Sequence, residues 1–357
     1  MSKKKSKLTL IIDGNWLFLS RMSILVNKFP NERDMMKELK LLMIKSINVV
    51  LRTFPLIDNI IFVADGGSWR NKIEIPDFLK TEGIEYKGNR HQSDDLDWDI
   101  IFGGYEDFIS KLAESGITTC RENGIEGDDW CWFWSRKLNK ENTNCIIWSK
   151  DRDLTQLVKV NENNCFTAWW NKDNGIILED NGVSKEDDFI DKFFFNPMYS
   201  QNSQIEDDLI EKSEKAEKIK PLSVVIDKII RGDQGDNVYP VILKEAKNNS
   251  GKKFRVSQKD IDYELDINNS NKVREYIENL LNLKSYKGRV HKTVDEIVEH
   301  FDYNKRLVLL EENSYPEQIL EKMNEYTEYN CNKDCSLAEQ KIQAEKNDLE
   351  RLLEDIL

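Results

Sequence analysis

Short hydrophobic runs alternate with stretches of helical spacing through the first 170 residues of the chain. A buried strand gives a short apolar run, whereas a helix that covers a sheet places apolar residues three or four positions apart. The pattern predicts strands over residues 8–12, 59–64, 116–120, 144–148 and 165–170. It predicts helices over residues 15–29, 33–54 and 103–115, from residue 128 onward, and after residue 153 through 158.

This alternation indicates an α/β fold with a mostly parallel central sheet flanked by helices. The texture changes beyond residue 180. Residues 196–220 are polar and rich in lysine and glutamate, which is typical of a loop or an insertion. Residues 221–310 predict short helices only, over 222–230, 272–283, 293–300 and 304–310. We therefore expect a core over 1–195, a polar loop over 196–220, a helical module over 221–330 and an amphipathic C-terminal helix over 331–357.

Composition indicates a well-packed globular protein, with 39% hydrophobic residues and nine tryptophans. The six cysteines lack paired C-x-x-C spacing, and four of them lie in apolar stretches, as small core residues do. No apolar run reaches membrane-spanning length, and the basic start leads into a short strand. We therefore expect a cytoplasmic protein from a reducing compartment, with no membrane association.

Acidic residues follow the apolar elements at several separate places. Asp13 and Asp65 each end a predicted strand, and the carboxyl ends of parallel strands meet at one edge of a sheet. Asp151 and Asp153 lie two apart in a segment expected to be extended, which would point both side chains the same way. Asp233 and Asp236 lie three apart, as on one face of a helical turn. The start of the helix at residue 128 adds Glu126, Asp128 and Asp129.

So many carboxylates in one place would repel one another strongly unless cations lay among them. Hard divalent ions prefer oxygen ligands, and a pair of such ions supports phosphodiester hydrolysis. Each acid alone has an ordinary explanation, since Asp-Gly is a common turn and Glu-x-Asp-Asp a common helix start. Four groups that each end a different element favour the metal-site interpretation.

The net charge of −13 argues against nucleic-acid binding at first sight. A phosphate backbone, however, responds to local positive surface, and bound divalent ions would offset much of the acidic charge. Two basic patches occur, over residues 244–259 and 284–292. Their candidate DNA-binding residues are Lys244, Lys247, Lys252, Lys253, Arg255, Lys287 and Arg289.

The order of the acidic motifs resembles the 5′ nuclease superfamily of flap endonucleases. The motifs are Ile12-Asp13-Gly14, Ala64-Asp65-Gly66, Ile125-Glu126-Gly127-Asp128-Asp129, Ser149-Lys150-Asp151-Arg152-Asp153 and Gly232-Asp233-Gln234-Gly235-Asp236-Asn237. The likeness extends over residues 8–325 and is greatest to the ribonuclease H enzymes of T-even bacteriophages, which are 5′-to-3′ exonucleases. Residues 68–70, 86–90 and 97–99 look like the arch region of those enzymes, which we place at about 66–100.

The resemblance implies a PIN-like core, an arch for a single-stranded 5′ end and a helix-three-turn-helix module for duplex. Carried over by position, Asp13, Asp65, Glu126 and Asp128 would serve a first metal ion. A second ion would be served by Asp129, Asp151, Asp153, Asp233 and Asp236.

The arch of such enzymes presents cations and aromatic rings to the substrate. Arg70, Lys87 and Arg90 would contact the scissile phosphate or the threaded strand, and a solvated run of charge is the alternative. Trp69 and Tyr86 would stack on bases or, equally, pack a small core within the arch. After Asn237 the glycine hairpin common in the family is replaced by Tyr239-Pro240-Val241, so we expect the patch at 244–259 to anchor duplex instead.

The resemblance thus implies a two-metal enzyme that uses Mg²⁺, replaceable by Mn²⁺, to remove RNA primers and adjacent DNA during phage replication. We expect a monomer in the host cytoplasm that acts on DNA and RNA–DNA hybrids with a 5′ end or flap. The expected protein partner is a single-strand-binding protein or a sliding clamp. The rivals are a PIN-domain ribonuclease for single-stranded RNA and a non-catalytic, structure-specific DNA-binding protein on the same fold.

Overall fold

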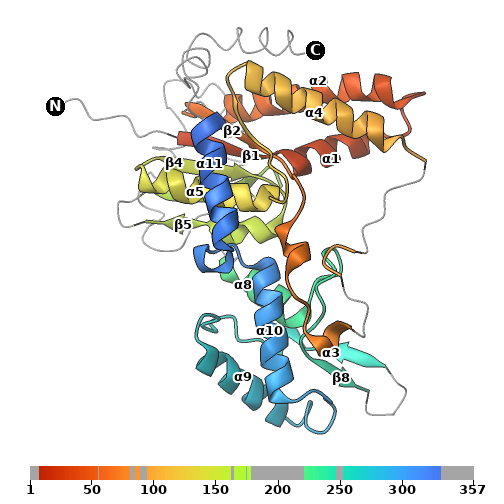
Figure 1. The fold of residues 1–357 in the computed structure, drawn as a ribbon, viewed down its shortest axis with the longest axis vertical. Coiled ribbons are helices and arrows are strands. Elements are labelled where there is room, and N and C mark those ends of the chain that lie inside the picture. Colours follow the sequence, from red (N-terminus) through yellow and green to blue (C-terminus); the bar gives the residue numbers. More distant parts are fainter. Residues whose placement is uncertain are drawn as a thin grey trace, which may run out of the picture. The chain divides into compact units, whose positions relative to one another are not determined.

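The chain divides into two compact units (Figure 1). The first consists of Met1–Ser68, Gln92–Ile219 and Pro316–Leu357, and the second of Trp69–His91 and Lys220–Tyr315. The computed structural model describes residues 8–54, 56–80, 85–88, 95–161, 165–173, 175–177, 221–246 and 252–330. The expected polar loop at 196–220 and the expected helix at 331–357 lie outside these ranges.

The first unit is built on a sheet whose central strands are parallel. Its strand order is β3-β2-β1-β4-β6-β5, with β7 also paired to β6. Five strands run parallel: β1 (Leu8–Asp13), β2 (Asn59–Val63), β3 (Thr118–Cys120), β4 (Asn144–Trp148) and β6 (Phe166–Asn171). The short strands β5 (Lys159–Val160) and β7 (Gly175–Ile177) pair antiparallel with β6. The mostly parallel sheet predicted from the sequence is confirmed.

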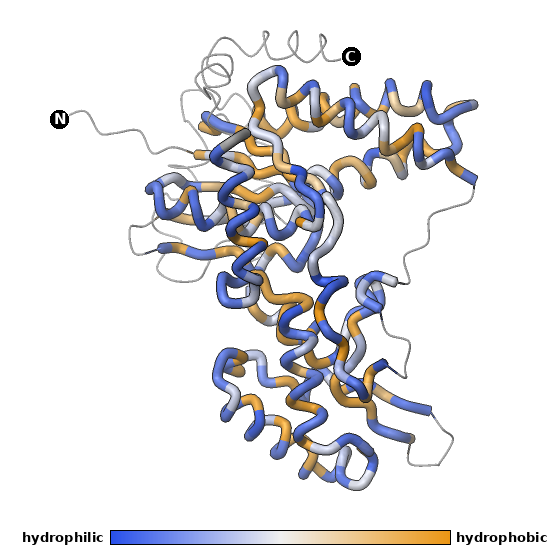
Figure 2. The backbone as a smooth tube through the Cα atoms, in the orientation of Figure 1, coloured by the Kyte–Doolittle hydropathy of each residue, from blue (hydrophilic) through white to orange (hydrophobic). Residues whose placement is uncertain are grey.

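Helices cover both faces of this sheet. Leu10 and Ile12 of β1 belong to a core shared with α1 (Gly14–Leu25), α2 (Glu32–Thr53) and α4 (Trp98–Glu114). On the other face α5 (Gly127–Lys140) lies along β1 and β4, and α11 (Glu317–Asn330) packs on α5 through the rings of Trp130 and Tyr326, 5.2 Å apart. In Figure 2 the hydrophobic colour runs through the central strands and alternates with blue along the helices.

The second unit is mainly helical. It contains α8 (Pro221–Arg231), α9 (Ser270–Asn282) and α10 (Val294–Val308), with the short helices η1 (Trp69–Lys72), α3 (Asp77–Lys80), η3 (Gln258–Asp260) and η4 (Glu312–Ser314). The amide nitrogen of Asn304 on α10 donates to the carbonyl oxygens of Ile229, at 2.9 Å, and Tyr239, at 2.7 Å. This buried amide joins α10 to the end of α8 and to the segment that follows it.

Three expectations about local structure are wrong. Residues 221–310 are not only helical, because β8 (Leu243–Glu245) and β9 (Lys253–Arg255) form an antiparallel hairpin. The helices expected at 293–300 and 304–310 are one continuous helix, α10. The segment after Asp151 is not extended, since Arg152–Leu157 form the 3-10 helix η2. Among the described residues, the helices are too short or too polar to cross a membrane.

Candidate active site

Three neighbouring strands of the first unit each lead to an acidic residue at their carboxyl ends. Asp13 ends β1, Asp65 follows β2, and Asp151 follows β4, while β2 and β4 pair with β1 on its two sides. From β1 the chain winds outward to β2 and β3, and then returns across the sheet to β4. Sites in α/β sheets form where the winding reverses in this way. The backbone alone therefore brings these three acids to one edge.

Asp13 is a buried carboxylate surrounded by hydrogen-bond donors and other acids. Its oxygens accept hydrogen bonds from the Trp16 amide, at 3.0 Å, and from the Ser149 hydroxyl, at 2.7 Å. Burial raises the pKa of Asp13 to about 7; the two hydrogen bonds oppose this rise, and the charges of Asp151 and Asp65 add to it. A divalent cation at this place would favour the ionised form, so the donor set fits a hard metal ion.

Asp65 is held against the first residue of α5. Its Oδ1 accepts the Gly127 amide at 2.6 Å, and its own amide donates to the Asn15 side chain at 3.1 Å. A Cβ added to Gly127 would lie 3.1 Å from the same Oδ1. The absence of a side chain at Gly127 thus permits the close approach of this carboxylate to the helix terminus, where the helix dipole favours negative charge.

The start of α5 supplies three further acids with different environments. Glu126 and Asp129 are buried and form a capping box, in which an Asp129 oxygen accepts the Glu126 amide at 3.1 Å. Asp128 is half-buried. The charges of Asp13, Asp128 and Asp151 all raise the pKa of the Cys131 thiol, after the larger effect of burial. These three acids therefore all act electrostatically on Cys131, and Asp129 caps α5.

Asp151 and Asp153 are linked by the turn that begins η2. Asp151 is the N-cap of this helix, and its Oδ1 accepts the Asp153 amide at 2.9 Å. The Ser149 hydroxyl accepts the Asp151 amide at 2.9 Å while donating to Asp13. One serine thus fixes Asp13 and the backbone of Asp151 together, and the predicted two-residue alternation is replaced by this capped turn.

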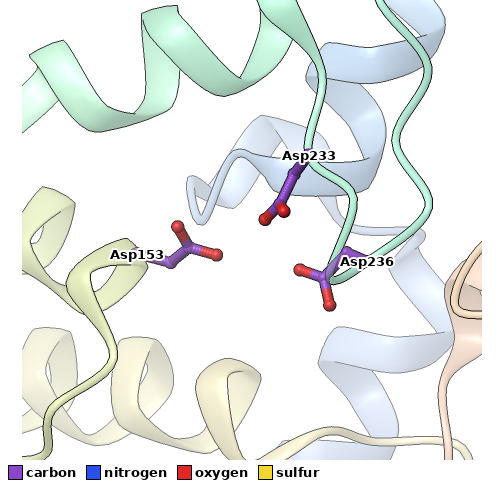
Figure 3. A group of neighbouring side chains, drawn as sticks. All are labelled: Asp153, Asp233 and Asp236. Atoms are coloured by element: carbon purple, nitrogen blue, oxygen red, sulfur yellow. The ribbon is translucent and has the colours of Figure 1, made fainter. Parts of the chain in front are cut away.

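The second unit holds Asp233 and Asp236 on one tight turn (Figure 3). The turn is closed by paired backbone hydrogen bonds of 2.8 Å between Asp233 and Val238, so the expected helical turn is wrong. Gly232 precedes it with φ of +71°, a left-handed conformation that favours glycine. Figure 3 shows both carboxylates leaving the same loop; Asp153, also labelled, belongs to the first unit.

A buried lysine lies between these two acids. The Lys228 ammonium of α8 is 2.8 Å from an oxygen of Asp233 and 2.6 Å from one of Asp236. Lysine is almost never fully buried unless it is paired. Sequence reasoning missed Lys228, although a lysine among the apolar positions Val225, Ile226 and Ile229 was the available signal. The expectation that Asp233 and Asp236 bind a second metal stays a prediction.

Several of the candidate arch residues pack against other side chains of the second unit. Arg70 is buried and lies 4.7 Å from the centre of the Trp69 ring, which itself packs on Tyr315 at 5.7 Å. Tyr86 is also buried, with the Lys87 ammonium 5.0 Å from its ring centre. Packing, one of the two roles expected for Trp69 and Tyr86, is the one this structure shows. Arg90 and Lys247 lie outside the described residues.

The basic candidates on the hairpin and the neighbouring loop have two kinds of environment. Lys244 lies 4.0 Å from the ring centre of Tyr286, and the Arg289 guanidinium donates to the carbonyl oxygens of Ser285 and Glu245. These two cations stabilise the unit itself. The others are exposed or half-buried, and they are Lys252, Lys253, Arg255 and Lys287.

Comparison with known proteins adds an independent finding. A 5′-3′ exonuclease of Buchnera aphidicola subsp. Acyrthosiphon pisum (strain APS) is 31% identical over 157 residues, or 42% of this chain and 48% of that protein. The match thus spans about half the length of the relative. A crystal structure of the T5 D15 protein co-crystallised with metal ions has a TM-score of 0.52 at 15% identity, over 98% of both chains. No protein-family model matches.

A further solved structure, a bacteriophage T5 flap endonuclease complex with DNA and metal ions, covers 98% of this chain with a TM-score of 0.49 and 15% identity. The likeness to the T5 D15 protein, with a TM-score of 0.52, concerns the fold alone.

Proposed function

We propose that this protein is a metal-dependent 5′-to-3′ exonuclease with flap endonuclease activity. The observation that carries the proposal is the meeting of Asp13, Asp65 and Asp151 at the ends of three adjacent parallel strands. The N-terminus of α5 completes this edge of the sheet, since its Gly127 amide binds Asp65. The 5′-3′ exonuclease relative supports the same activity.

The donor set in the first unit consists of carboxylates, which suits two Mg²⁺ ions, with Mn²⁺ as a substitute. Asp13, Asp65, Glu126 and Asp128 would hold the first ion, and Asp151, Asp153 and Asp129 would contribute to the second. When bound, such ions lower the pKa of an attacking water and stabilise the leaving oxygen. Ser149 has a positioning role, because its hydroxyl holds both Asp13 and the Asp151 amide.

The substrate we propose is a DNA duplex or an RNA–DNA hybrid with a 5′ end or flap. Arg70, Lys87 and Arg90 would contact its phosphates as cations. The biological role would be the removal of RNA primers and adjacent DNA during replication, in a phage-infected cell, by a cytoplasmic monomer. A single-strand-binding protein or a sliding clamp would be its partner.

The test is cleavage of a 5′ flap, a nicked duplex and an RNA–DNA hybrid with Mg²⁺, by the wild type and by Asp151→Asn. We expect all three substrates to be cut from the 5′ side. The variant should lose at least about a hundredfold in rate, because it lacks the Asp151 carboxylate that would hold a metal ion, and with it the stabilisation of charge in the transition state. Asp107→Asn is the matched control. Asp107 is an exposed acid of α4 that is paired with Lys40 and Lys111, none of which is a candidate site residue.

Each rival predicts a different result. A single-strand ribonuclease would cut unpaired RNA without needing a 5′ end next to duplex, and a non-catalytic protein would bind flaps without cutting them. If Asp151→Asn cuts as fast as the wild type, the metal assignment is wrong.

A further inference from the structure

We propose that the β8–β9 hairpin contacts the duplex part of the nucleic-acid substrate, with the aromatic ring of Phe254 packing against sugars and base edges. The inference deepens the proposed function and rests on it for the kind of substrate. All the residues that carry it belong to the second unit.

Phe254 is a large aromatic residue that remains 49% exposed at the centre of β9. In the hairpin register it lies opposite Lys244, whereas its neighbours Lys253 and Arg255 point to the other face, since side chains alternate along a strand. A partner that covers the exposed part of this ring would remove apolar surface from water, which favours binding.

The backbone that carries Phe254 is held firmly by its surroundings. The Glu245 amide donates to the Arg289 carbonyl at 2.9 Å, and the Arg289 side chain donates back to the Glu245 carbonyl at 2.7 Å. The Ala246 amide donates to the Lys252 carbonyl at 2.8 Å. The ring is therefore presented by a braced two-stranded ribbon, and ordering this element costs little when a partner binds.

Lys244 adds a second connection between the hairpin and the body of the unit. Its ammonium lies over the ring of Tyr286, whose hydroxyl donates to Asp260 at 2.7 Å. Tyr286 is almost completely buried. The Lys244 side chain thus anchors the hairpin on a buried ring.

The charges around Phe254 favour nucleic acid over a protein partner. The exposed cations are Lys252, two residues before Phe254 and therefore on its side of the hairpin, and Lys284 and Lys287 on the loop that Arg289 joins to β8. Lysine is depleted from protein–protein interfaces, whereas lysines beside an apolar aromatic residue are typical of proteins that insert apolar side chains into DNA grooves. A groove of duplex also admits a two-stranded β-ribbon, which favours duplex over single strand.

The experiment measures binding separately from cleavage. Fluorescence anisotropy with a blunt duplex and with single-stranded DNA, in Ca²⁺ or EDTA, compares the wild type, Phe254→Ala, Phe254→Trp and Leu222→Ala over a range of salt concentrations. Leu222 is the matched control, since it is an equally exposed apolar residue of the second unit, at 49%. Thermal unfolding verifies that each variant is folded.

We expect Phe254→Ala to weaken duplex binding about tenfold, a loss of the size seen when an aromatic contact to nucleic acid is removed. The slope of log Kd against log salt should stay unchanged, because a phenyl ring releases no counterions, whereas Lys252→Ala should reduce it by about 0.9. Phe254→Trp should bind within about twofold of the wild type, and Leu222→Ala should bind like the wild type.

Unchanged duplex affinity in Phe254→Ala overturns the inference, and so does an equal loss on single-stranded DNA. Unchanged affinity in a protein that still cuts flaps refutes the hairpin contact alone. A wild-type protein that neither binds duplex nor cuts it refutes the proposed function.

Discussion

The negative charge of two groups of acids in this molecule is compensated in different ways. In the first unit, Asp13 is surrounded by hydrogen-bond donors and by other carboxylates, and burial raises its pKa to about 7. In the second unit, Asp233 and Asp236 share the buried ammonium of Lys228. A bound external cation would therefore stabilise the first group. The second group is already compensated by Lys228, a cation of the same unit.

The largest expected effect comes from removing that internal cation. Lys228→Met should lower the free energy of unfolding by about 3 kcal/mol, because it leaves two acids facing each other with an uncompensated charge. Chemical denaturation without metal measures the change. Asp13→Asn should have the opposite effect on stability. It removes a buried acid among other acids and should therefore stabilise the metal-free protein.

A triple variant sharpens this prediction. Adding Asp233→Asn and Asp236→Asn to Lys228→Met removes the repulsion and should recover part of the lost stability. If the triple variant is no more stable than Lys228→Met alone, the lysine acts through packing of its methylene groups and not through charge.

A second lysine of the same unit binds a buried histidine and helps to lower its pKa. The Lys292 ammonium donates to Nδ1 of His300 at 2.9 Å, and the imidazole lies near the rings of Phe78 and Tyr239. Burial, aided by the charge of Lys292, lowers the pKa of His300 to about 3. The folded protein thus keeps this imidazole neutral at pH values where the unfolded chain binds a proton.

This depressed pKa predicts that acid destabilises the protein from about pH 6.5 down to about pH 3, the window between the unfolded and folded values. The contribution of His300 should fall by about 2 kcal/mol between pH 7 and pH 5, at 1.4 kcal/mol per pKa unit. Urea denaturation at several pH values measures it. The slope should flatten in His300→Gln, and an unchanged slope would assign the pH dependence to other groups.

The smallest effect concerns the close approach of Asp65 to α5. Gly127→Ala places a Cβ 3.1 Å from the Asp65 oxygen, so the carboxylate must move by a few tenths of an ångström. We expect about a threefold change in cleavage rate and less than about 1 kcal/mol in stability. Gly103→Ala is the control, since a Cβ there would meet no atom within 4 Å. Equal rates for both variants would show that the position of Asp65 tolerates this shift.

The sheet and its strand-end acids could be predicted because β1, β2 and β4 are short apolar runs with an acid at the last residue of β1 and within three residues after β2 and β4. The 5-residue β4, read straight from its sequence, has the predicted bounds Asn144–Trp148. The hairpin β8–β9 could not be predicted in this way, since its strands Leu243–Glu245 and Lys253–Arg255 are three residues long and mostly charged. Their pairing depends on Arg289, which is distant in sequence.

Buried polar residues account for the other differences. His300 and Asn304 interrupt the apolar pattern of α10, so the sequence predicts two helices where the structure has one. Both side chains are buried and bind partners from other segments, Lys292 for His300 and two carbonyl oxygens for Asn304. Lys228 was missed for the same reason, because a lysine is normally assigned to the surface.

The two hydrogen bonds from Asn304 have a consequence for how the chain folds. The turn with Asp233 and Asp236 lies between their acceptors, Ile229 and Tyr239, whereas their donor comes 75 and 65 residues later in the chain. Contacts between residues so far apart in sequence form late, after the intervening loop has closed. During translation, Asp233 and Asp236 are synthesised long before α10, the helix whose Asn304 binds the residues on both sides of their turn. The geometry of this turn is therefore completed only after residue 304 has emerged.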